Sequence, residues 1–95
     1  MNILQKHVDL LGQHARDKVT GFVGVVDSIS FDLYGCVQAV VRPPAKDGEV
    51  KDGRWFDVHR LVILDKPRAM PVPSFPQLAS ADGTHTKGPA EKSAR

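Results

Sequence analysis

The chain has 95 residues, a formal net charge of +2 and 41% apolar residues, which fits one small globular domain. Its 13 basic and 11 acidic residues are interspersed, and this pattern argues against sequence-specific binding of nucleic acid. A single cysteine excludes an internal disulfide, and no apolar run is long enough for a membrane span or a signal peptide. We therefore expect a reduced, intracellular protein.

Residues 1–12 are predicted to form a lead-in to the domain. Leu4, Val8 and Leu11 recur at helical spacing, which predicts a short helix that ends at Gly12. A helix of this length is marginal unless other parts of the protein support it.

Residues 13–66 alternate between apolar and polar side chains, which predicts strands. The first is a short polar strand at 14–19, expected at a sheet edge. A long strand at 22–31 follows, and Gly24 within it indicates a bulge or a close approach of two backbones. The third strand, at 36–42, is apolar on both sides and is expected to be central.

A loop at 43–53 follows the third strand, because its two prolines cannot continue a ladder and its two Asp-Gly pairs are turn signals. This loop is expected to protrude. Strands at 54–58 and 61–64 come next, with a single tight turn between them. Five short strands in this arrangement predict an all-β, SH3-like five-stranded barrel over residues 13–66. Closing the sheet would remove exposed edges.

The composition changes after the barrel region. Residues 67–95 contain prolines and small polar residues without periodicity, which predicts a flexible tail. It is expected to be extended at 71–76 and disordered beyond. A chain that ends at residue 66 is therefore expected to keep its stability within about 1 kcal/mol.

Three segments carry a resemblance to known proteins: 17–26 (DKVTGFVGVV), 34–38 (YGCVQ) and 55–61 (WFDVHRL). Together they resemble a family of small uncharacterised proteins encoded by tailed phages and prophages. The glycine-containing start of the second strand is also similar to that of KOW and Tudor barrels. The resemblance implies a phage origin and use in the cytoplasm of an infected bacterial host, and it supplies no catalytic residues.

Residues that could carry catalysis or bind metal are scattered along the chain. The four histidines lack metal-ligand spacing and are expected on the surface. Cys36 enters an apolar strand, so we interpret it as a small buried hydrophobe and not as a nucleophile. Solvated strand ends are expected for the aspartates Asp17, Asp27, Asp32 and Asp57. We expect no enzymatic activity, no cofactor and no metal.

A binding surface is predicted around Trp55. Period-two alternation places Phe56 and Val58 in the core and leaves Trp55 on the polar face beside Asp57. The predicted binding residues are Trp55, Arg54, Arg60, Tyr34 and Arg42. Arginine with aromatic residues is typical of a protein hot spot and equally of a nucleotide or single-strand site. A tryptophan that merely covers the barrel end is an equal alternative.

The leading functional hypothesis is a non-enzymatic binding module that acts on host machinery or host defence through protein interaction. One alternative is a sponge that sequesters a small nucleotide signal. Another is a minor virion component that uses its C-terminal arm for assembly. The expected partner is thus a host or phage protein or a small nucleotide, not a membrane. Formation of a homo-oligomer is left open.

Overall fold

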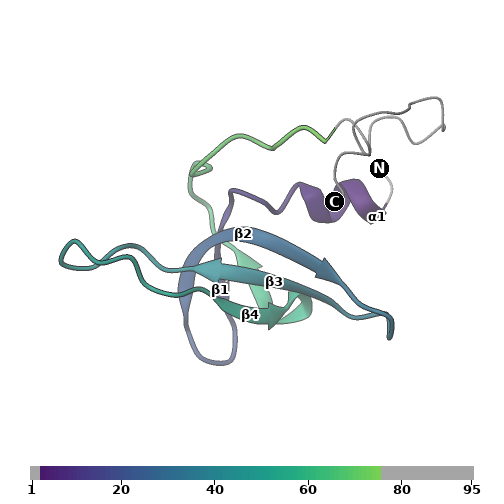
Figure 1. The fold of residues 1–95 in the computed structure, drawn as a ribbon, viewed down its shortest axis with the longest axis horizontal. Coiled ribbons are helices and arrows are strands. Elements are labelled where there is room, and N and C mark those ends of the chain that lie inside the picture. The colour runs from purple at the N-terminus through teal and green to yellow at the C-terminus, as the bar shows by residue number, and fades with distance from the viewer. Residues whose placement is uncertain (1–2, 76–95) are drawn as a thin grey trace, which may run out of the picture.

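Five antiparallel strands form one sheet in the computed structural model, which describes residues 3–75 (Figure 1). A short helix, α1 (Ile3–Val8), precedes them. The strands are β1 (His14–Asp17), β2 (Val23–Phe31), β3 (Val37–Arg42), β4 (Arg54–Asp57) and β5 (Leu61–Ile63). One turn of 3-10 helix, η1 (Val58–Arg60), separates β4 from β5. Each predicted strand is present, with bounds that differ by at most two residues from those observed.

The strand order across the sheet is β4-β3-β2-β1-β5. The all-β prediction is confirmed, but the pairing is an open series and does not close the sheet as a barrel. β3 is internal, as expected. The prediction that β1 lies at an edge is wrong, because β1 pairs with both β2 and β5. Its alternate residues Ala15 and Asp17 are fully buried, although most residues of this strand are polar.

β2 combines a close backbone approach with a bulge. A Cβ atom at Gly24 would lie 2.2 Å from the carbonyl oxygen of Arg42, so only glycine fits at this position. The bulge itself lies three residues later, where the register changes from Val26↔Val41 to Ser28↔Val40. Asp27 is the extra residue, and bulges of this kind bend a strand and increase its twist.

The core is built from small side chains. Ala15, Val26 and Ala39 are fully buried, which lets the strands and the lead-in approach closely. Partly buried apolar residues pack around these three, namely Leu10, Leu11, Ile29, Val58 and Leu61. The leucines from the lead-in therefore complete the core, and this contact supports a helix of only six residues.

The segment after the last strand is attached to the lead-in. We call residues 67–75 the strap. Its Ala69 N–H donates to the Gly12 carbonyl at 2.8 Å, and the Arg68 guanidinium donates to the carbonyls of Leu11 and Asp9 at 2.8 and 2.7 Å. The strap contains no helix or strand and runs beside the lead-in (Figure 1). The rest of the predicted tail, 76–95, lies outside the described residues.

No helix within residues 3–75 has both the length and the apolar character required to cross a membrane.

Candidate functional site

Trp55 projects from the outer face of an edge strand. β4 pairs with β3 on one side, and within residues 3–75 no strand pairs with its other side. Trp55 lies opposite Val40 and is 53% exposed, whereas Phe56 lies opposite Ala39 and is 8% exposed. The alternation predicted for this strand is therefore present, with Phe56 in the core and Trp55 outside.

The loop at 43–53 protrudes from the sheet beyond the end of β3 and the start of β4 (Figure 1). At its tip, Lys46 and Glu49 exchange two backbone hydrogen bonds of 2.9 Å around Asp47 and Gly48. Both central residues have positive φ, 52° and 79°, as a tight hairpin turn requires. The second Asp-Gly pair acts differently, because a Cβ at Gly53 would lie 2.4 Å from the Val40 side chain. This glycine allows the loop base to pass over β3.

Arg60 forms an ion pair with a carboxylate that is fully buried, while its own side chain is 41% exposed. Its Nε and Nη2 donate to the two carboxylate oxygens of Asp17 at 2.8 and 2.7 Å, and its guanidinium carbon lies 5.2 Å from the centre of the Phe56 ring. Thr20 donates two more hydrogen bonds to Asp17, from its backbone N–H and its hydroxyl. The bonds from Arg60 are the main cause that holds the pKa of Asp17 well below its ordinary value.

The expectation that Asp17 is a solvated strand end is therefore wrong, because its side chain is fully buried. The carboxylate is tolerated there because four donors surround it. Asp57 does lie at a strand end, where its carboxylate accepts from the backbone N–H and the ring of His59. The backbone bond is the main cause that lowers the pKa of Asp57.

Tyr34 and Arg42 lie at opposite ends of β3. Tyr34 is 84% exposed in the β2–β3 turn, where Asp32 accepts hydrogen bonds from the backbone N–H groups of Tyr34 and Cys36. Arg42 ends the strand and forms an ion pair with Asp27. The six residues of β3 span about 17 Å, which is too far for both side chains to contact one small ligand.

Arg54 is exposed and adjacent to Trp55, but it points to the opposite side of the strand because it lies opposite Val41. The five predicted binding residues therefore do not converge. Trp55 and Arg54 share the edge strand, Arg60 in η1 pairs with Asp17, and Tyr34 and Arg42 lie at two other places.

No family model, curated protein or solved structure matches this chain. The resemblance to phage proteins thus stays a prediction, and the chemistry of the surface carries the functional argument.

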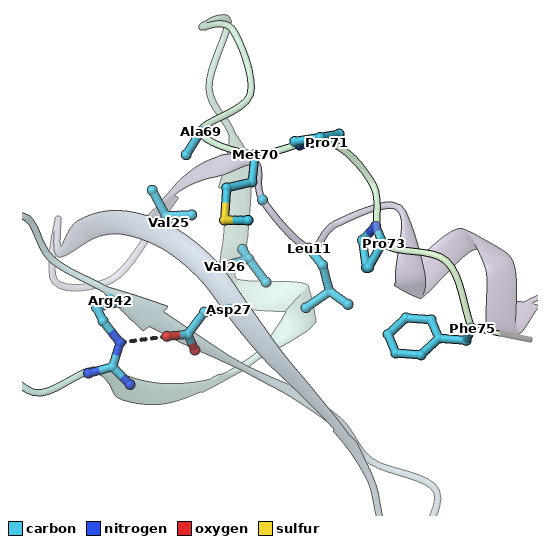
Figure 2. A pocket seen from close by; sticks show the side chains of 11 residues that line it. Leu11, Val25, Val26, Asp27, Arg42, Ala69, Met70, Pro71, Pro73 and Phe75 are labelled. Atoms are coloured by element: carbon cyan, nitrogen blue, oxygen red, sulfur yellow. Dashed lines mark hydrogen bonds and ion pairs between the residues drawn. The ribbon is translucent and has the colours of Figure 1, made fainter. Parts of the chain in front are cut away.

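A pocket of about 540 Å³ lies between the strap, the lead-in and β2 (Figure 2). Its walls are mainly apolar and include Leu11, Val25, Val26, Met70, Pro71 and Phe75. The Asp27–Arg42 ion pair forms its polar part. Sequence reasoning missed this pocket because it assigned residues 67–75 to a flexible tail. The signal in the sequence was the mainly apolar segment from Met70 to Phe75. It contains more large apolar side chains than a flexible linker usually has, which indicates contact with the domain.

A second hollow, of about 560 Å³, lies between α1, the β2–β3 turn and η1. Cys36 lines it and is exposed, so the prediction of a small buried hydrophobe is wrong. The strand begins one residue later than predicted, at Val37, which leaves Cys36 in the turn. His7 also lines the hollow but is 8% exposed, contrary to the expected surface position. Its ring Nδ1 bonds to the Ile3 carbonyl, and the ring contacts Phe31 edge to face. No cluster of three or more potential metal ligands occurs within residues 3–75.

Proposed function

We propose that this protein is a non-enzymatic protein-interaction module of SH3-like architecture that binds an extended segment of a partner along β4. The strand order β4-β3-β2-β1-β5, with one 3-10 turn between β4 and β5, supports the architectural part of the proposal. The observation that carries the binding part is Trp55, half-exposed on a sheet edge beside the buried Phe56.

Edge strands point the N–H and C=O groups of every second residue away from the sheet, and an added strand satisfies them. Backbone pairing supplies affinity in this mode, and side chains on the edge supply specificity. Trp55 offers a large contact area with few rotatable bonds, which makes it a suitable anchor. Arg54, on the other side of the same strand, favours a partner with an acidic residue next to the one that meets Trp55.

The other two hypotheses have less support. A nucleotide sponge needs arginines that converge on a phosphate, whereas Arg60 and Arg42 are paired with Asp17 and Asp27. A virion component with an assembly arm needs a segment directed to neighbouring subunits. The strap instead forms hydrogen bonds with the lead-in of its own chain. Action on a host protein in the infected cell remains the setting that the phage resemblance favours.

The test selects binding peptides from a random 12-residue library on the intact chain and measures their affinity for variants. Trp55→Ala is expected to keep the fold and lose about 2 kcal/mol of binding, since hot-spot residues of this type contribute that much. Phe56→Ala is expected to lose about 3 kcal/mol of stability through a cavity. Amide chemical shifts should change along 54–57 when a selected peptide binds.

Tyr34→Ala is the matched control, because Tyr34 is also a large aromatic residue and is more exposed than Trp55, at another place. It should leave the affinity unchanged. A loss with Tyr34→Ala but not with Trp55→Ala would move the binding surface to the β2–β3 turn. Unfolding of Trp55→Ala alongside a stable Phe56→Ala would mean that the two faces of β4 are reversed, and the proposal would fail.

A further inference from the structure

A hollow of about 560 Å³ lies between α1, the β2–β3 turn and η1, and it is separate from the pocket under the strap. Its volume is within the range of ligand pockets, about 300–1,000 Å³. The apolar part of its wall includes Leu10, Val37 and Val58, which are partly buried. Leu10 and Val58 also pack against the core, so the fold of the domain holds this wall in place.

His7 supplies a polar atom to the hollow. It lines the hollow although the residue is only 8% exposed. Its ring Nδ1 lies 2.8 Å from the carbonyl oxygen of Ile3. A carbonyl oxygen can only accept, so the single proton of a neutral ring is on Nδ1, and Nε2 is then an acceptor.

The Nε2 atom of His7 is free to accept a hydrogen bond from a ligand. It has no hydrogen-bond partner within residues 3–75. In the same part of the chain, every side-chain nitrogen or oxygen that is fully enclosed does have a partner. Nε2 is therefore not enclosed, and it opens on the hollow that the ring lines. The Phe31 ring, 5.6 Å away between centroids, and the Nδ1 bond hold the His7 ring, so the acceptor is positioned before a ligand enters.

The charged side chains that line the hollow have both signs. Lys6 is exposed, and the Asp57 carboxylate already accepts from the backbone N–H and the ring of His59. Because Lys6 and Asp57 carry opposite charges, the lining does not select a ligand of one sign. The ligand that fits best is therefore an uncharged apolar body with a single hydrogen-bond donor.

We propose that this hollow binds a neutral phenol, with its ring against Leu10 and Val58 and its hydroxyl donating to Nε2 of His7. A planar ring buries apolar area without losing rotatable bonds, so it binds at a lower entropic cost than a flexible chain does. A phenolic hydroxyl is also a stronger donor than an alkyl hydroxyl, because it is more acidic.

The experiment titrates the full chain with para-cresol at about pH 8, where a histidine ring is normally neutral, and follows amide chemical shifts. The probe para-methylanisole has the same body without the donor, and para-toluate and para-methylbenzylammonium carry a negative and a positive charge. Para-cresol is expected to shift amides at 35–37 and 58–59. It should bind about fivefold more tightly than para-methylanisole, the typical effect of one hydrogen bond, and more tightly than both charged probes.

A pair of variants tests the role of His7. His7→Asn removes the acceptor and keeps an amide donor near the position of Nδ1, so it should bind the two neutral probes equally. Phe31→Leu is the matched control, because it removes the same ring contact and leaves Nε2 in place. It should keep the preference for para-cresol. A thermal melt of each variant confirms that it is folded before it is titrated.

Cys36 gives an independent readout, because it lines the hollow, is exposed and is the only cysteine in the sequence. Saturating para-cresol should slow its alkylation by iodoacetamide, followed by mass spectrometry. The same concentration should not slow the alkylation of free N-acetylcysteine. Para-cresol should protect Cys36 at a lower concentration than para-methylanisole does, and this comparison needs no variant.

Four results would overturn the proposal. They are an equal preference for para-cresol in His7→Asn and in the native chain, a loss of that preference in Phe31→Leu as large as in His7→Asn, tighter binding of either charged probe, and no protection of Cys36. Neither His7 nor Cys36 belongs to β4, so binding of a peptide at the β4 edge can be kept or lost independently.

Discussion

At the scale of single residues, burial in this protein follows contacts that are distant in sequence. Asp17 is fully buried because Arg60, 43 residues later, donates to both of its carboxylate oxygens. Cys36 is exposed because the turn that Asp32 organises extends through it. The charged Asp17 is therefore buried and the apolar Cys36 is exposed, which is the reverse of what each side chain alone favours.

Gly24 and Gly21 are each required for a different physical reason, and substitutions can distinguish the two reasons. Gly24→Ala places a methyl group 2.2 Å from a backbone oxygen, so we expect a loss of about 1–3 kcal/mol from overpacking. Gly21 has φ of 81°, and apart from its two chain neighbours no heavy atom of residues 3–75 lies within 4 Å of the place that a methyl group would take. Gly21→Ala should therefore cost about 1–2 kcal/mol from backbone strain alone.

Substitution by asparagine distinguishes backbone strain at Gly21 from steric overlap at Gly24, because asparagine tolerates positive φ but is larger than alanine. In urea denaturation, Gly21→Asn should be more stable than Gly21→Ala, whereas Gly24→Asn should be less stable than Gly24→Ala. The interpretation would be abandoned if both alanine variants matched the native chain, or if asparagine restored stability at Gly24.

At the scale of elements, the lead-in and the strap act as one unit. α1 has six residues, and such a helix is not stable alone. Leu10 and Leu11 attach the turn that follows it to the core, and Arg68 binds the carbonyls of Asp9 and Leu11. The strap therefore satisfies backbone groups near the end of α1 that the helix cannot satisfy itself.

This arrangement revises the expected effect of truncation. A chain that ends at Lys66 loses the bonds of Arg68 and Ala69, so we expect it to be less stable by about 1–3 kcal/mol. A chain that ends at Met70 keeps these bonds and serves as the matched control. Both are compared by urea denaturation. Equal stability of the two truncated chains would show that the strap contributes nothing to folding.

At the scale of the whole molecule, the Asp17–Arg60 ion pair connects the two ends of the domain. It joins the end of β1 to η1, and the Lys18 N–H adds a bond of 2.7 Å to the Arg60 carbonyl. Arg60 also lies over the ring of Phe56, which contacts Phe22. Loss of this pair would affect β1, β4 and β5 together, and not one loop.

Acid should therefore destabilise the protein through Asp17. Its pKa in the folded state lies well below the ordinary value of 3.8, so the unfolded chain takes up the proton first as the pH falls. The stabilisation is fully present above the unfolded pKa and is lost as the pH falls below it toward the folded pKa. Asp57, whose pKa is also lowered, acts in the same direction.

Thermal melts between about pH 7 and pH 2 measure this effect. Asp17→Asn should be less stable at neutral pH, and its stability should fall less than that of the native chain on acidification. Asp27→Asn is the control, because its ion pair is exposed and such pairs contribute little. If Asp17→Asn and the native chain lose stability in parallel below about pH 4, the buried carboxylate of Asp17 is not what makes the fold acid-sensitive.

The sequence by itself determined the number, order and approximate bounds of the strands. Period-two alternation, the two prolines at 43–44 and the turn at Asp47-Gly48 are local signals, and local signals are what a strand and a turn require. The same alternation correctly separated Phe56 from Trp55 within β4.

Only the tertiary structure decided how the strands pair and what the site contains. β1 is internal, Arg60 pairs with Asp17, and the strap forms a pocket with β2. The decisive contacts join residues 43, 57 and 59 positions apart. No local pattern encodes such pairs, because a carboxylate or a run of prolines has the same appearance in the sequence whether or not a partner from elsewhere in the chain buries it.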